Sequence, residues 1–327
     1  MAYHVVIPDN VDQAALDVLA QASGLTVTAP GKMDRAAALA AVAQADALII
    51  RSGTTVDAEM LAAAPLLKVV ARAGVGVDNV DLAAATRRGV VVMNTPGGNT
   101  ISTAEHAFAL MLALVRHIPA AHQSLKDGQW DRKAFAGTEL RGKTLGIVGF
   151  GRIGQAIARR AVAFKMTVIA FEPYANEQTY RVRDELDVEL VDLDTLYARA
   201  DIITLHPALT DETRGMINAQ SIARMKPGVR LVNAARGGLI AAADLAEAIR
   251  RGQVAGVALD VYEPEPPSAD YPLLGLPEVV HTPHLAASTP EAQVEVGVEA
   301  AHLVVDALLH GRYANVVNPE ALPSKQA

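Results

Sequence analysis

The chain of 327 residues contains no cysteine. Disulfide bonds, cysteine-ligated zinc and a thiol nucleophile are therefore excluded, which agrees with a reducing compartment. Aromatic residues make up only 4% of a sequence that is 51% hydrophobic, so the core must be built from alanine, valine, leucine and isoleucine. A core of this kind is typical of helices packed on a parallel sheet.

Long apolar runs and an excess of positive charge are also missing. The most apolar helix-like stretch, AFALMLALV, has nine residues, well under the roughly 18 needed to span a bilayer. The N-terminus lacks the pattern of a signal peptide. The net charge of −7 would on average repel nucleic acid and an anionic membrane surface. We therefore expect a cytoplasmic protein with no nucleic-acid or membrane partner and no metal.

Short apolar runs alternate with alanine-rich amphipathic segments in two series. The first series extends from HVVIP to VVVMNT, and the second from TLGIVGF to EVVHTPH. Such alternation predicts βαβ units and parallel sheets, and the length favours two domains. The sequence therefore predicts an α/β fold with two doubly wound parallel-sheet domains.

The stretch between the two series, PGGNTISTAEHAFALMLALVRH, predicts a helix of about four turns with a Ser or Thr N-cap. A last helix over residues 290–310 has no strand after it, so we expect it to pack back on the first domain. A domain over residues 99–287 would then be inserted into one built from residues 1–98 and 288–327. Only a short tail follows, and no appended regulatory domain is expected.

The stretch GFGRIG lies between an apolar strand and a helix predicted over 155–164, as in dinucleotide-binding domains. Gly149 would make the tight turn, Gly151 would let the backbone approach a pyrophosphate, and Gly154 would permit close helix–strand packing. Glu172 ends the next strand, 18 residues after Gly154, where it could accept hydrogen bonds from an adenosine ribose. Because a carboxylate would repel a 2′-phosphate and no cation stands beside it in FEPY, NAD is favoured over NADP.

Hydride transfer to a dinucleotide requires a proton acceptor or donor and, for an anionic substrate, a cation. Ligands of doubly wound sheets bind at the carboxyl ends of the strands. Polar side chains stand at four such ends: His206, Arg236, Asp260 with Glu265, and His284. By spacing alone, Arg236 and Glu265 could equally be solvated loop residues.

Nine histidines are present, and most are expected to have no catalytic role. His106 and three others lie on predicted helices. His281 and His284 are rivals, because both belong to the last strand and its tip. The position of His284 directly after a proline at the tip favours it as the acid–base residue.

Six motifs in order resemble those of the D-isomer-specific 2-hydroxyacid dehydrogenase family over nearly the whole chain: RAGVGVDNVDL, GNTISTAEHAFALMLALVR, GFGRIG, NAARGGLI, GVALDVYEPEPP and HTPHLAAST. The resemblance implies a Rossmann NAD-binding domain inserted into a flavodoxin-like substrate domain. It also implies a catalytic set of Arg236, Glu265 and His284. Arg236 would pair with the substrate carboxylate and polarise the carbonyl, and His284 would exchange the proton of the 2-hydroxyl. Glu265 would stabilise the imidazolium.

The resemblance further implies contacts with cofactor and substrate. Asp260 matches a position beside the nicotinamide amide. Other positions match cofactor contacts: Val75, Arg152, Ile153, His206, Pro207, Ala234, Ala235, Arg236, His284 and Ala287. The backbone of Gly74 and Val75 would meet the substrate carboxylate, with Arg51 and Ser52 at the other end of the substrate. Arg132 could come from the partner subunit of a homodimer. In two places the sequence departs from the family pattern. Glu172 replaces the commoner Asp, and in LHPAL the proline is shifted from its usual position, which affects the cofactor contact expected at Pro207.

Within the family, the resemblance is closest to enzymes that oxidise 3-phosphoglycerate to 3-phosphohydroxypyruvate with NAD, at the entry to serine biosynthesis. The short chain resembles forms without a serine-sensing domain, so feedback inhibition by serine is not expected. A glyoxylate or hydroxypyruvate reductase, or another D-2-hydroxyacid dehydrogenase, is the alternative and would need no phosphate site. A nucleotide-sensing corepressor is a third reading. Arg51 would bind the phosphate, unless it pairs with a carboxylate such as Asp57.

Overall fold

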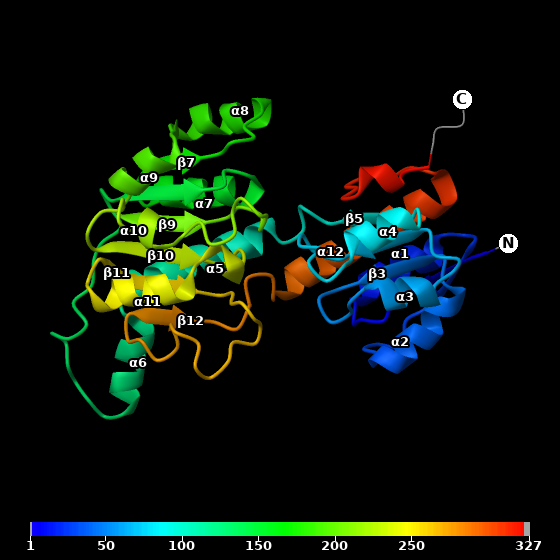
Figure 1. Ribbon diagram of the computed structural model, residues 1–327, viewed down its shortest axis with the longest axis horizontal. Coiled ribbons are helices and arrows are strands. Elements are labelled where there is room, and N and C mark those ends of the chain that lie inside the picture. Colours follow the sequence, from blue (N-terminus) through cyan, green and yellow to red (C-terminus); the bar gives the residue numbers. More distant parts are fainter. Residues whose placement is uncertain (1, 324–327) are drawn as a thin grey trace. The chain divides into compact units, whose positions relative to one another are not determined.

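The computed structural model describes residues 2–323, which divide into two compact units (Figure 1). The first unit consists of the residues up to Asn99 and those from Thr289 on, and the second extends from Thr100 to Ser288. The boundaries expected from the sequence, after residues 98 and 287, each lie one residue earlier. In this described part of the chain, no helix is long and apolar enough to cross a membrane.

The first unit contains a five-stranded parallel sheet with the order β2-β1-β3-β4-β5, which is that of flavodoxin-like folds. Its strands are β1 (Tyr3–Val6), β2 (Leu25–Thr28), β3 (Ala47–Ile50), β4 (Val69–Arg72) and β5 (Val91–Asn94). Its helices are α1 (Gln13–Gln21), α2 (Arg35–Ala41), α3 (Ala58–Ala63), α4 (Leu82–Arg87) and α12 (Pro290–His310), with short 3-10 turns η1 (Val42–Gln44) and η3 (Pro319–Ala321). In β3, Ala47 and Ile49 face one hydrophobic core, and Leu48 and Ile50 face the other. Both faces are covered, which explains the unbroken apolar run.

Helix α12 packs against α1 and β4 of the first unit, as expected for the last helix. Val296, Ala300 and Val304 are buried in the same core as Leu19 of α1. Thr289 begins the helix by accepting a hydrogen bond from the backbone N–H of Ala292, the usual role of threonine at an N-cap. The chain therefore returns to the first sheet after completing the second unit.

The second unit contains a seven-stranded parallel sheet with the order β12-β11-β10-β9-β6-β7-β8. Its strands are β6 (Thr144–Val148), β7 (Thr167–Phe171), β8 (Glu189–Leu190), β9 (Ile202–Leu205), β10 (Val229–Asn233), β11 (Val254–Leu259) and β12 (Val279–His281). Its helices are α5 (Thr100–Val115), α6 (Ile118–Lys126), α7 (Arg152–Ala163), α8 (Glu177–Leu186), α9 (Leu193–Arg199), α10 (Ala219–Ile222) and α11 (Ala242–Arg250), with the 3-10 turn η2 (Gly237–Leu239). The strand order reverses between β6 and β9, which is the switch point of a Rossmann fold. The predicted fold class is confirmed.

Two helices begin earlier than the sequence pattern indicated. Helix α7 starts at Arg152 and not near residue 155, because Gly151 occupies its N-cap and the Gln155 N–H already bonds to the Gly151 carbonyl at 2.9 Å. Helix α5 starts at Thr100, so the serine and threonines considered as its N-cap lie within its first turn.

Candidate active site

Two of the three fingerprint glycines, Gly149 and Gly154, are required by close contacts at the end of β6. Gly149 has a φ of 90°, and a Cβ there would lie 2.8 Å from the carbonyl carbon of His206. A Cβ on Gly154 would lie 2.2 Å from the Gly149 carbonyl oxygen, whereas no atom lies within 4 Å of a Cβ on Gly151. The amides of residues 152–154 have no acceptor within α7, and a helix N-terminus favours anions. The open side of Gly151 and these amides fit a pyrophosphate.

A cavity of about 730 Å³ adjoins the fingerprint. Five predicted cofactor residues line it: Gly149, Gly151, Glu172, His206 and Pro207. Glu172 is held in the cavity wall because its Oε2 accepts the Phe150 N–H at 2.8 Å and its Oε1 accepts the Tyr174 N–H at 3.0 Å. The predicted acid and the glycine turn therefore share one site.

Other lining residues were not singled out from the sequence: Asp192, Asp194, Tyr197, Thr210, Glu212, Thr213, Met216 and Arg224. The two aspartates follow β8, a strand of two residues that is too short to recognise from an apolar run. Arg224 forms an ion pair with Asp194 and lies over the ring of Tyr197, 5.5 Å from its centroid. The sequence neighbours of Glu172 contain no cation, as expected, but Arg224 reaches the same cavity from the turn that follows α10, and no sequence pattern indicated this.

The ring of His206 contributes a polar group to this cavity. Desolvation lowers the pKa of His206 to about 3, so the ring is neutral at physiological pH. Its Nε2 lies 2.8 Å from Thr204 Oγ1, while its buried Nδ1 has no hydrogen-bond partner among the described residues. Buried nitrogens are seldom left unpaired, and this nitrogen has almost no accessible surface of its own.

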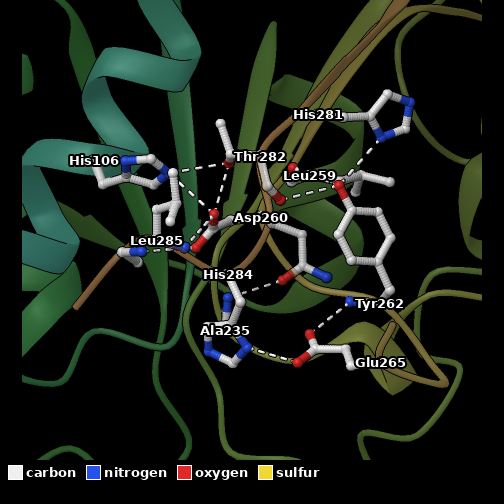
Figure 2. Close-up of polar contacts among 12 residues, drawn as sticks. His106, Ala235, Leu259, Asp260, Tyr262, Glu265, His281, Thr282, His284 and Leu285 are labelled. Atoms are coloured by element: carbon white, nitrogen blue, oxygen red, sulfur yellow. Dashed lines mark hydrogen bonds and ion pairs between the residues drawn. The ribbon is translucent and has the colours of Figure 1, made fainter. Parts of the chain in front are cut away.

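Glu265 and His284 lie in direct contact (Figure 2). His284 Nδ1 is 2.7 Å from Glu265 Oε2, and the Tyr262 N–H donates to Glu265 Oε1 at 2.9 Å. Both side chains are partly exposed, at 49% for His284 and 36% for Glu265. The Nε2 of His284 has no partner in the described part of the chain, and it can therefore meet a substrate.

His281 points away from this pair in Figure 2. Its Nδ1 lies 3.2 Å from the Tyr262 hydroxyl, and the two rings are stacked. Burial lowers the pKa of His281. Only His284 of the two rivals has a carboxylate partner, which supports the choice made from the sequence, although its catalytic role stays a prediction.

Arg236 follows β10, the strand beside β11. A Cβ on Gly237 would lie 2.1 Å from the carbonyl carbon of Tyr262, so the loop that carries Arg236 packs directly on the loop that leads to Glu265. The Asn233 side chain donates to the Arg236 carbonyl at 2.8 Å. Since β10, β11 and β12 are neighbours, the three predicted catalytic residues follow adjacent strand ends of one sheet.

Asp260 directly follows β11 and is fully buried. Its carboxylate accepts four hydrogen bonds, from His106 Nε2 at 3.1 Å, Thr282 Oγ1 at 2.6 Å, the Leu285 N–H at 2.8 Å and the Ala286 N–H at 2.9 Å. Burial raises the pKa of Asp260, but these hydrogen bonds outweigh that effect and hold the pKa below its usual value. The contact expected with the nicotinamide amide stays a prediction. His106 was set aside because it lies on a helix, and its contact across 154 positions gave no signal in the sequence.

Arg51 and Ser52 follow β3 in the first unit. The Arg51 N–H donates to Asp9 Oδ2 at 2.6 Å, and its guanidinium donates to the Asn10 carbonyl at 3.0 Å. Asp57 instead pairs with Arg35 at 2.6 Å. The alternative in which Arg51 pairs with Asp57 is therefore wrong.

Gly74 and Val75 follow β4. The Gly74 N–H donates to Thr95 Oγ1 at 2.7 Å, so of these two amides only that of Val75 has no acceptor among residues 2–323. Arg132 is exposed in the loop after α6. The remaining predicted cofactor residues follow β10 and His284: Ala234, Ala235 and Ala287.

Comparison with known proteins decides the family. Residues 108–286 match the NAD-binding domain of the D-isomer-specific 2-hydroxyacid dehydrogenases. The chain belongs to this family. The fingerprint and its cavity thus lie in an NAD-binding domain, and the relationship expected from the six motifs is confirmed.

Similar 2-hydroxyacid dehydrogenases include D-3-phosphoglycerate dehydrogenase of Archaeoglobus fulgidus, 49% identical over 98% of this chain and 60% of that protein. Hydroxypyruvate reductase of Thermotoga maritima is 46% identical over 91% of this chain and 95% of that protein. The crystal structure of a glyoxylate reductase from Paecilomyes thermophila has a TM-score of 0.86 at 30% identity and covers 97% of this chain and 98% of that one. The chain spans only 53% to 60% of the length of the first relatives that are named phosphoglycerate dehydrogenases.

Proposed function

We propose that this family member is an NAD-dependent dehydrogenase that oxidises 3-phosphoglycerate to 3-phosphohydroxypyruvate, the entry to serine biosynthesis. The contact of His284 with Glu265 supports the dehydrogenase activity, because it pairs a proton acceptor with a carboxylate on the sheet that carries the fingerprint. Relatives at 45–53% identity that are named D-3-phosphoglycerate dehydrogenase support the choice of substrate.

The three side chains have distinct roles in this proposal. The fingerprint and Glu172 would hold NAD, which would supply the hydride acceptor for the carbon that carries the 2-hydroxyl. His284 takes the hydroxyl proton at Nε2, and the carboxylate of Glu265 at Nδ1 stabilises the imidazolium that forms. Arg236 pairs with the substrate carboxylate through two parallel N–H groups. In reduction of the keto acid, His284 returns the proton.

The charge of the cavity supports NAD over NADP. Four carboxylates line it, those of Glu172, Asp192, Asp194 and Glu212, and Arg224 is the one Lys or Arg side chain among the lining residues. Because Arg224 is already paired with Asp194, it offers little compensation to a 2′-phosphate, whose charge is about −1.5 to −2. The phosphate of NADP would therefore be repelled.

A glyoxylate or hydroxypyruvate reductase is the second candidate, favoured by the Thermotoga relative, of which this chain covers 95%. Steady-state kinetics with NAD and NADP against phosphorylated and unphosphorylated hydroxy and keto acids separate the two. We expect the highest kcat/KM for the phosphorylated pair. Preference for glyoxylate or hydroxypyruvate would establish the second candidate, and absence of turnover with every acid would leave a nucleotide-sensing protein.

We also propose a homodimer that forms through the second unit. Helix α6 has no buried side chain. Its Ile118 and Leu125 are 53% and 58% exposed, and Trp130 in the loop after the helix is 79% exposed. A second copy that covers these side chains would remove apolar surface from water. Light scattering should give a dimer for the protein and a monomer for Leu125→Asp; a monomeric wild type would contradict the proposal.

A further inference from the structure

Three successive backbone amides around His284 bond to a single residue, Asp260. The His284 N–H donates to the Asp260 carbonyl at 2.8 Å, and those of Leu285 and Ala286 donate to the two carboxylate oxygens at 2.8 and 2.9 Å. His284 has a φ of 54°, a left-handed conformation that is unfavourable for residues other than glycine. Asp260 therefore holds the backbone of His284 in a conformation that the segment would rarely adopt alone.

Two side chains in turn hold the carboxylate of Asp260. Thr282 Oγ1 and His106 Nε2 both contact its Oδ1, at 2.6 and 3.1 Å, and Figure 2 shows His106 pointing at this group from α5. A hydroxyl has one hydrogen and an ionised carboxylate only accepts, so the Thr282 hydrogen points at Asp260. His106 Nε2 also lies 3.1 Å from Thr282 Oγ1, and it must therefore carry the hydrogen in both contacts.

From this chain of contacts we infer that His106 is a positioning residue for the reaction proposed above. It donates to a fully buried carboxylate, which would otherwise lack one of its donors, and such groups rotate or take up water to recover a lost bond. Rotation of the Asp260 carboxylate would release the amides of Leu285 and Ala286. The imidazole of His284 would then lose its fixed position. The inference rests on the proposed role of His284 in proton transfer.

Two substitutions at His106 test whether its hydrogen-bond donor is needed or only its volume. Glutamine places an N–H donor at about the reach of Nε2, whereas leucine fills similar volume without a donor. Since displacement of a reacting group by about 1 Å can cost about 100-fold in rate, we expect His106→Leu to lower kcat by about 10 to 100-fold. The KM of the hydroxy acid should stay within about threefold, and His106→Gln should restore kcat to within about threefold of wild type.

Glu105→Gln is the matched control, because Glu105 is the neighbouring residue on α5 and its exposed side chain pairs with Arg160, away from Asp260. Its kcat should equal that of the wild type. A wild-type kcat in His106→Leu, or an equal loss in His106→Gln and His106→Leu, would overturn the inference.

Hydrogen exchange in the cofactor-free protein tests the network without activity. We expect the amides of Leu285 and Ala286 to exchange about tenfold faster or more in His106→Leu than in wild type, His106→Gln or Glu105→Gln. If the wild type showed no dehydrogenase activity, the proposed function would be wrong. The exchange rates would still show whether His106 stabilises the hydrogen bonds between Asp260 and the amides of Leu285 and Ala286. Unchanged exchange would overturn the network itself. If His106→Leu does not fold, Thr282→Val removes the other donor at similar volume, and wild-type kcat and exchange in that variant would equally overturn the inference.

Discussion

Replacing Gly154 by alanine should destabilise the second unit by forcing helix α7 away from β6. The added Cβ would lie 2.2 Å from the Gly149 carbonyl oxygen and 3.1 Å from Ile147 Cγ2, about 1 Å too close to a carbonyl oxygen for a normal contact of about 3.3 Å. A backbone carbonyl cannot rotate away as a side chain can. Overpacking of this kind costs about 1–3 kcal/mol, and alanine regains about 1 kcal/mol in a helix.

We therefore expect a net loss near 2 kcal/mol in the free energy of unfolding, because the clash is with backbone. For a domain of this size that corresponds to a fall in Tm of about 4–8 °C. Gly151→Ala should behave differently, since no atom lies within 4 Å of its Cβ and its φ of −73° is accessible to alanine. Its unfolding free energy should stay within about 0.5 kcal/mol of wild type.

For cofactor binding we expect the opposite, with a larger effect of Gly151→Ala than of Gly154→Ala. A methyl group on Gly151 would occupy the open side of the turn that fits the pyrophosphate. A steric penalty of about 1–3 kcal/mol would raise the Kd of NAD by about 5 to 150-fold. Thermal unfolding by circular dichroism and NAD binding by calorimetry measure both effects, with Gly97→Ala, which also has no atom within 4 Å of its Cβ, as the control. NAD binding by Gly151→Ala within twofold of wild type, or wild-type stability of Gly154→Ala, would refute the reasoning.

Three further substitutions test the proposed site. His284→Ala should lower kcat by about 100-fold or more, as removal of a general acid–base residue does, with little change in NAD affinity; a larger loss in His281→Ala would reverse the choice between the two histidines. Glu172→Ala should narrow the preference for NAD, and a wild-type protein that uses NADP equally well would contradict the cofactor assignment. Arg51→Ala should lower kcat/KM for 3-phosphoglycerate by about 10 to 100-fold, the range of a charge-assisted contact, while activity on hydroxypyruvate hardly changes; equal losses on both substrates would favour the general reductase.

Most of the fold and part of the site follow from local patterns. Apolar runs such as ALIIR predict strands buried on both faces, and β3 faces two cores as that pattern requires. The fingerprint needs only residues a few positions apart, because its turn, its N-cap and its helix packing are made by neighbours in the chain. The predicted start of α7 is three residues too late. In the sequence, the glycine at the N-cap cannot be distinguished from the other glycines of the loop.

The side-chain partners were decided by the tertiary structure alone. Strand β8, with its two residues, brings Asp192 and Asp194 to the cavity, and Arg224 reaches it from the turn that follows α10. Asp57 pairs with Arg35, and His106 meets Asp260 across 154 positions. No spacing in the sequence encodes these contacts, because they depend on which strand ends the sheet order makes neighbours and on which helix covers them. Hydrogen bonds within a turn recur at fixed intervals along the chain, whereas a contact between two loops exists only once the whole sheet has formed.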